Sequence, residues 1–269
     1  MKTYKYIIFI VFGILGLVSC RKELMIPITG DNTAIVESYL KAGDTSALVY
    51  ISKIIPFSDD TNDSKVMIPG LNVFINGRKL TEIDTGVYQL PMTDERITAG
   101  TTYKLEFQYA GKDVTSETTV PSAPEGFKES AAVVYTTRIT STSSGFPAQM
   151  DPVELSWINP DTSYYYVLIK YMETTPDYIN SRFTNTDFQF IQSSTPTQEN
   201  TYRLDQRMIR CFGTYRIILY KVNNEFNDVF TKNGTNSNNL VNPTTNITNG
   251  YGVFTGMNSD TLYLEVIPN

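Results

Sequence analysis

The chain has 269 residues, of which 41% are hydrophobic and 19% charged, and its formal net charge is −6. This composition fits one large or two medium globular domains. The acidic balance, without a block of basic residues, argues against a nucleic-acid partner. The sequence contains no histidine, which excludes Ser-His-Asp and Cys-His catalytic sites and imidazole-based zinc sites. We therefore expect no metal or other cofactor and no enzymatic activity.

The first 19 residues are typical of a secretory signal peptide. Lys2 and Lys5 precede an apolar run, Ile7 to Val18. Twelve helical residues span about 18 Å, which is short of the roughly 30 Å hydrocarbon core of a bilayer. A cleaved signal is therefore favoured over a permanent membrane-spanning helix.

The run ends Leu17-Val18-Ser19-Cys20, which resembles the bacterial lipobox. The resemblance implies that Cys20 is lipidated and anchors the mature chain to a membrane; a plain signal peptide with an incidental cysteine is the alternative. Residues 20–32 then form a tether. Arg21-Lys22-Glu23 is similar to a surface-export signal of Bacteroidetes lipoproteins, or it is an ordinary polar stretch. Lipidation leaves Cys211 without an intramolecular partner, and we expect it to be a buried apolar residue.

Residues 33–121 predict a first β-sandwich, of immunoglobulin-like or transthyretin-like type. Tyr103 to Tyr109 alternates apolar and polar side chains, as a half-buried strand does. Asn76-Gly77 is a strong hairpin signal. Further strands are expected at residues 35–40, 47–54 and 112–120.

Residues 121–126, rich in Pro and Gly, predict a boundary, and residues 127–269 predict a second sandwich. Its order of a Trp157 strand, a Tyr-rich strand at 165–171 and a Gly213-Thr214-Tyr215 strand resembles a fibronectin type III domain. That resemblance implies that the Tyr215 hydroxyl closes a corner of the backbone. Short helices are expected at 177–183 and 224–232, and a last strand around Leu262 to Val266. The predicted fold class is all-β.

Residues 242–256, above all Asn249-Gly250-Tyr251-Gly252-Val253-Phe254, resemble a family of Bacteroidetes lipoproteins of unknown function. Members of that family are often encoded beside TonB-dependent outer-membrane receptors. The resemblance implies an outer-membrane lipoprotein with such a receptor as its partner, and it brings no catalytic residue. Gly250-x-Gly252 lies before the last predicted strand and is expected to be structural.

Three other features of the sequence are candidate binding sites. Asp59-Asp60-Thr61-Asn62-Asp63 holds oxygen ligands of the type calcium prefers, but without the spacing of an EF-hand loop. The aromatic residues between Tyr164 and Phe190 suit either a core or a binding surface. The polar loop 233–239 is either a binding loop or a simple connection.

The leading hypothesis is a lipid-anchored binding or accessory protein of the cell envelope, associated with TonB-dependent uptake. The second is a structural or adhesive envelope lipoprotein. The third is a carboxylate-dependent hydrolase, which would need two acids facing each other across a cleft.

Overall fold

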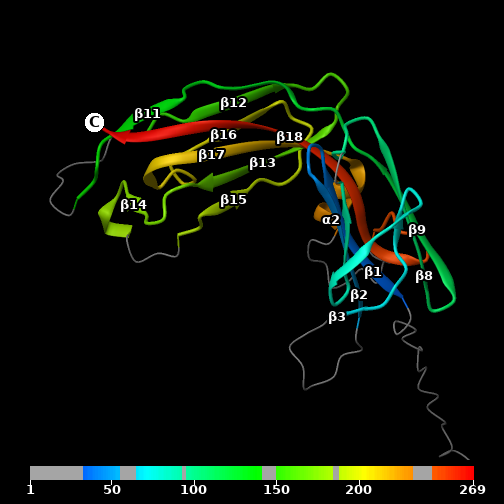
Figure 1. Cartoon of the computed structure of the whole chain (residues 1–269). Coiled ribbons are helices and arrows are strands. Elements are labelled where there is room, and N and C mark those ends of the chain that lie inside the picture. The colour runs from blue at the N-terminus through cyan, green and yellow to red at the C-terminus, as the bar shows by residue number, and fades with distance from the viewer. Residues whose placement is uncertain (1–32, 55–64, 93–94, 141–149, 184–187, 233–243) are drawn as a thin grey trace, which may run out of the picture.

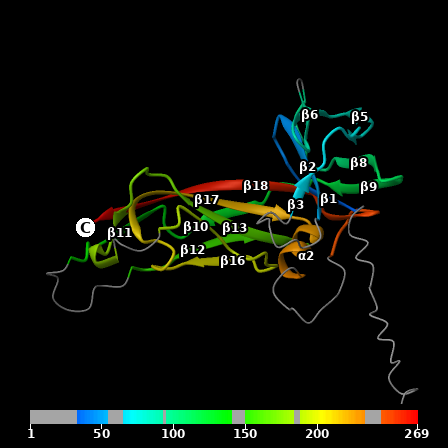
Figure 2. The same ribbon diagram turned by 90° about the horizontal axis from the view of Figure 1, so that it is seen from below.

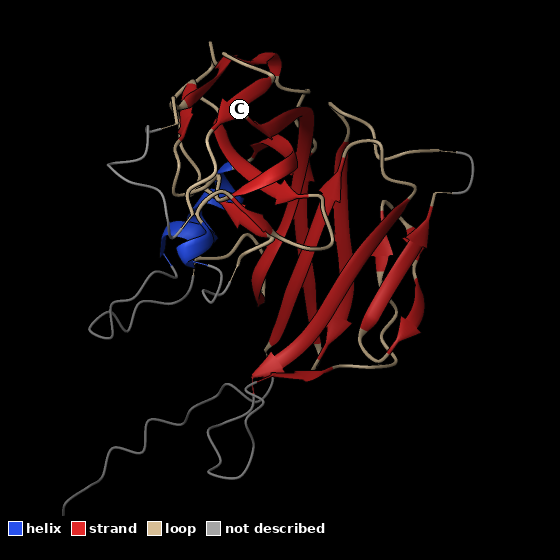
Figure 3. Cartoon of the chain, turned by 90° about the vertical axis from the view of Figure 1, so that its left-hand side faces the viewer, coloured by secondary structure: helices blue, strands red, loops and turns tan. Residues whose placement is uncertain are grey.

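The computed structural model describes residues 33–54, 65–92, 95–140, 150–183, 188–232 and 244–269, and these residues form a mostly β fold of two packed sandwiches (Figure 1). The all-β expectation is confirmed. Figure 3 shows how strands dominate the described chain. The two sandwiches lie at an angle to each other, and one long strand runs through both (Figures 1 and 2).

In the first sandwich, a large sheet packs against a small one. The large sheet contains β1 (Ala34–Lys41), β2 (Ser46–Ile54), β3 (Lys65–Met67), β6 (Thr81–Asp84) and β7 (Val87–Pro91). The small sheet contains β4 (Phe74–Ile75), β5 (Arg78–Lys79), β8 (Thr102–Tyr109) and β9 (Lys112–Thr119). The Asn76-Gly77 hairpin is confirmed, with φ angles of 48° and 73° at its two residues.

The second sandwich repeats this plan. One layer contains β11 (Val133–Thr136), β13 (Tyr164–Tyr171), β15 (Ile191–Ser193) and β17 (Cys211–Val222), with β14 (Asp177–Tyr178) paired to the start of β17. The other layer contains β10 (Glu125–Glu129), β12 (Val153–Ile158) and β16 (Thr201–Leu204). The core between them includes Trp157, Tyr165 and Tyr215, each at most 3% exposed.

The last strand, β18 (Gly250–Pro268), joins the two sandwiches. Its first part pairs in parallel with β1, from Ala34 with Gly250 to Lys41 with Met257. Its remainder pairs with β17 and, in parallel, with β11. The larger layers of both sandwiches are therefore one continuous sheet of 11 strands.

Sharing β18 changes two expectations drawn from the sequence. Ile247 and Phe254 belong to the first core, so the second sandwich does not take up all of residues 127–269. The last strand begins at Gly250, well before the expected Leu262. Glycine weakens a strand in isolation, but here close packing against neighbouring backbone requires it.

The helix expected at 224–232 is confirmed as α2 (Asn224–Lys232), which lies where the two sandwiches meet (Figure 1). The helix expected at 177–183 is wrong. Residues 177–178 form β14, because they pair with Cys211 and Phe212, and only Ser181–Phe183 turns as a 3-10 helix, η2.

Candidate functional site

Several of the candidate residues lie outside the part of the chain that the structure describes. These are Cys20 with its tether, the acidic stretch 59–63 and the polar loop 233–239. Lipidation of Cys20 and cation binding by residues 59–63 therefore stay predictions.

Cys211 is fully buried, as the sequence predicts for a small apolar residue. Burial raises the pKa of its thiol to about 11, which keeps the sulfur protonated and unreactive at neutral pH. Its backbone is held by Tyr215, whose hydroxyl donates to the Cys211 carbonyl and accepts from the Cys211 amide, both at 2.9 Å. The predicted corner at Tyr215 is thus present, and Cys211 is structural.

The aromatic residues between Tyr164 and Phe190 divide among three places. Tyr165 is 1% exposed and belongs to the core. Tyr166 lies on the outer face of β13 at the junction of the sandwiches, and Tyr178 lines a pocket at the far end. Phe188 packs edge-on against Tyr171, with ring centroids 5.2 Å apart. These residues therefore do not form a single binding surface.

At the junction, α2 contacts strands of both sandwiches through one aromatic ring. The ring of Phe226 stacks on Tyr166 of β13, with centroids 5.1 Å apart, and meets Tyr39 of β1 edge-on at 6.1 Å. Tyr166 also stacks on Tyr220 at 4.8 Å. Because the faces of Tyr166 are covered in this way, the cluster fixes the helix on the sheet.

A carboxylate supports the same junction. Glu225 of α2 accepts hydrogen bonds from Thr118 at 2.8 Å, Asn223 at 3.1 Å and Thr255 at 3.3 Å. Thr118 belongs to β9 and Thr255 to β18. Glu225 therefore ties the helix to the first sandwich and to the shared strand.

The described part of the family-like stretch 242–256 also contributes to the junction. A Cβ at Gly252, where φ is +99°, would overlap the backbone carbonyl of Val36, and one at Gly256 would lie 2.7 Å from Val120 Cα. The Asn246 side chain caps the same strand, because its amide donates to the Phe254 carbonyl at 2.7 Å and its oxygen accepts from the Phe254 amide at 3.1 Å. This arrangement fits the expectation that Gly250 and Gly252 have a structural role.

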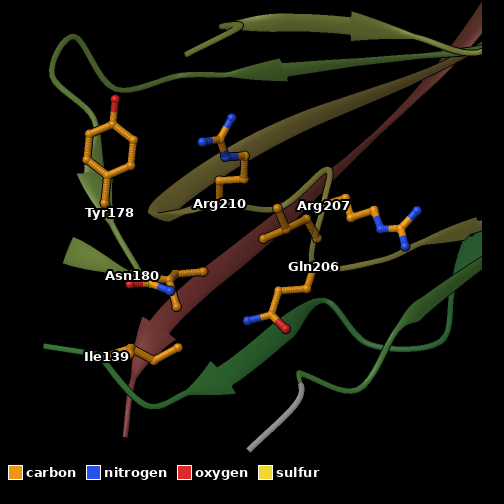
Figure 4. Close-up of a pocket in the computed structure, with 8 residues that line it drawn as sticks. Ile139, Tyr178, Asn180, Gln206, Arg207 and Arg210 are labelled. Atoms are coloured by element: carbon orange, nitrogen blue, oxygen red, sulfur yellow. The ribbon is translucent and has the colours of Figure 1, made fainter. Parts of the chain in front are cut away.

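A pocket for a small ligand lies at the far end of the second sandwich; we call it the tip pocket (Figure 4). Its volume is about 520 Å³, within the range of small-molecule sites. Three chain segments meet there, and the lining residues are Ile139, Tyr178, Ile179, Asn180, Gln206, Arg207, Ile209 and Arg210.

A charged pair frames the tip pocket. Arg138 and Asp177 form two hydrogen bonds, of 2.6 and 2.8 Å, and Arg138 lies over the ring of Phe212, 4.6 Å from its centroid. Hydrogen bonding to Arg138 lowers the pKa of Asp177 below its ordinary value. The pair holds the segment before Ile139 against β14, so the two sides of the pocket are joined.

A second pocket, of about 680 Å³, lies on the first sandwich between residues 70–74 and the β8–β9 hairpin. Two of its lining residues are acids, Glu106 and Asp113. Glu106 pairs with Lys104 at 2.7 Å, and Asp113 accepts from the Gln108 amide at 2.9 Å. Each carboxylate is thus engaged with a neighbour on the strand surface.

No sequence pattern predicted the tip pocket. The signal that could have indicated it is the pair of arginines, Arg207 and Arg210, in an otherwise acidic chain. Within the described residues, no group of three or more Cys, Asp or Glu could hold a metal ion. In that same part of the chain, no helix is both long and apolar enough to span a bilayer.

Two solved structures from titin are similar to the chain at a low level. The Ig tandem domains A164-A165 share 9% identity at a TM-score of 0.21, with 88% of this chain and 98% of that chain covered. Domains A168-A170 share 9% identity at a TM-score of 0.19, with 88% and 66% covered. No curated protein matches the chain.

A match to a protein family covers most of the chain. Residues 22–262 match the family described as a domain of unknown function, DUF4249. The match begins two residues after Cys20 and includes both sandwiches, the junction and the tip pocket. The chain therefore belongs to the DUF4249 family.

Proposed function

We propose that the protein is a lipid-anchored binding or accessory protein of the outer membrane, working with a TonB-dependent receptor and carrying out no catalysis of its own. The observation that carries the proposal is Leu17-Val18-Ser19-Cys20 at the end of a short apolar run. Acyl chains on Cys20 contribute about 0.8 kcal/mol of membrane affinity for each buried CH₂. Without them, an acidic body has no electrostatic attraction to an anionic lipid surface.

The fold supports a role in which the tip pocket is held away from the membrane. The described chain begins beside β1, whose Ala34 pairs with Gly250 at the start of β18. The tip pocket lies at the opposite end of the molecule, near β14 and the end of β18 (Figure 1). The 19 residues of β18 span at most roughly 60 Å at 3.3 Å per residue. An anchor at Cys20 would thus leave the tip pocket facing away from the tethered end.

The shared strand supports the same role. Two sandwiches on a flexible linker would reorient freely. Here the continuous sheet, the Phe226 contacts and the Glu225 hydrogen bonds join them. A ligand or receptor at the tip would therefore be held at a fixed distance from the first sandwich.

Co-purification tests the receptor partnership. Tagged wild-type protein and the Cys20→Ala variant would be purified from native membranes in mild detergent, and the bound proteins identified by mass spectrometry. We expect a TonB-dependent receptor to be enriched with the wild type only. Equal recovery of envelope proteins with both, together with normal uptake in a deletion strain, would contradict the partnership.

A structural or adhesive role is the second candidate, because the rigid junction also suits a spacer. That role needs no ligand at the tip, so ligand binding there separates the two. A carboxylate-dependent hydrolase has less support, since the residues that line the tip pocket include no acid.

A further inference from the structure

The tip pocket combines an apolar floor with a rim that donates hydrogen bonds and carries positive charge. We propose that it binds a small organic carboxylate, with the apolar body of the ligand on the floor and its carboxylate at the rim. This inference rests on the proposed binding function, and it adds the chemical class of the ligand.

The floor is apolar because its backbone is already bonded. Ile139, Ile179 and Ile209 are each at most 5% exposed. The Ile139 amide donates to the Ile179 carbonyl at 2.8 Å, and the Ile179 amide donates to the Arg210 carbonyl at 3.0 Å. The Ser181 amide donates to the Ile139 carbonyl at 3.0 Å. These groups are not available to a ligand, so the floor offers mainly hydrocarbon contact, which favours an apolar body.

The rim supplies donors. The Asn180 side-chain oxygen accepts from the Arg182 amide at 3.0 Å, which leaves the NH₂ group as the ligand-facing end of that side chain. Gln206 and Arg207 come from the Asp205 to Arg210 connection and lie on the other side of the pocket (Figure 4). Among the described residues, none forms a hydrogen bond or ion pair with the Gln206 amide or the Arg207 guanidinium.

The charge balance at the rim favours an anion. Arg207 and Arg210 line the pocket and no acid does. The nearby acids are engaged: Asp177 pairs with Arg138, and Asp205 accepts from the Arg207 backbone amide at 2.8 Å. A guanidinium binds a carboxylate through charge-assisted, often bidentate, hydrogen bonds. A neutral ligand would use the amides but would gain nothing from the charge of Arg207.

Calorimetry with paired probes tests the proposal on the full-length protein in detergent. The probes are 4-fluorobenzoate and its neutral counterpart 4-fluorobenzamide, which match closely in size and ring. We expect the carboxylate to bind at least five-fold more tightly than the amide. We also expect its affinity to fall at least three-fold in Arg207→Gln, since Arg207 is exposed and its replacement leaves the fold intact.

Arg203→Gln is the matched control, because Arg203 is exposed on β16 in the same sandwich and does not line the pocket. It also corrects for partitioning of the probes into detergent. Equal affinity for acid and amide would overturn the proposal, as would identical affinities in the two arginine variants or no binding of either probe. None of these results depends on membrane attachment or on a receptor, so failure here is distinct from failure of the proposed function.

Discussion

Gly252→Ala probes the coupling of the two sandwiches through β18. Gly252 lies in the part of β18 that pairs with β1, where its φ is +99° and a Cβ would overlap the Val36 carbonyl. A left-handed φ costs an L-residue about 1–2 kcal/mol. Overpacking that displaces backbone adds about 1–3 kcal/mol. We therefore expect a loss of about 2–5 kcal/mol, a large part of a typical domain's stability.

The assay uses the single tryptophan, Trp157, which is 3% exposed in the second core. Its fluorescence follows unfolding of the second sandwich in urea, whereas Gly252 lies in the first. Because β18 belongs to both, we expect Gly252→Ala to lower the urea midpoint reported by Trp157. Circular dichroism should give the same midpoint, as for a single cooperative transition.

Gly43→Ala is the matched control. Gly43 has a similar φ of +88°, and a Cβ there would meet nothing within 4 Å. It should therefore show only the backbone cost of about 1–2 kcal/mol. Equal losses in the two variants would refute the role of close packing. An unchanged Trp157 midpoint in Gly252→Ala would refute the coupling.

Three further predictions concern stability. Tyr215→Phe should destabilise the fold by about 1–3 kcal/mol in urea melts, because the buried amide and carbonyl of Cys211 lose their shared partner. Glu225→Ala should cost about 1–3 kcal/mol and increase proteolysis at the junction, since the buried Thr118 hydroxyl loses its acceptor and Asn223 and Thr255 each lose one of theirs. Asp177→Asn should cost less than about 1 kcal/mol at pH 7, because its ion pair with Arg138 is solvent-exposed. Since the folded pKa of Asp177 is lowered, that stabilisation is present above the unfolded pKa near 4 and is lost as pH falls through the folded value.

Each of these has a control and a contrary result. Tyr263→Phe, at a tyrosine that is 56% exposed, should leave the midpoint unchanged; a loss as large as that of Tyr215→Phe would contradict the buried-corner argument. Glu154→Ala, on the exposed face of β12, is the control for Glu225→Ala. For Asp177→Asn, a stability difference from the wild type that grows between pH 5 and pH 2 would contradict the sign of the pKa shift.

Local patterns in the sequence predicted much of the fold. Alternation located strands such as Tyr103 to Tyr109, and Asn76-Gly77 located a hairpin. The Phe226 and Phe230 spacing located α2, in which Phe226 packs on Tyr166 of the sheet and on Phe230 of the next helical turn. The Tyr215 corner was expected from the resemblance to a fibronectin type III domain, and the hydroxyl does bond the Cys211 backbone.

Features that depend on distant contacts were missed. The Gly250 to Gly256 stretch looks like a poor strand, and only the closeness of Val36 and Val120 shows why glycine is needed there. Residues 177–178 form a strand because they pair with Cys211 and Phe212 of β17, which are distant in the sequence. The tip pocket needs three segments far apart in the chain, so no single stretch of sequence could indicate it.

Lipidation of Cys20 is the central claim about what this protein does, and metabolic labelling tests it most directly. Cells expressing the wild type or Cys20→Ala would be labelled with palmitate and separated into membrane and soluble fractions. The account predicts a labelled, membrane-bound wild type and an unlabelled variant released from the membrane. A Cys20→Ala protein that stays labelled and membrane-bound would contradict it.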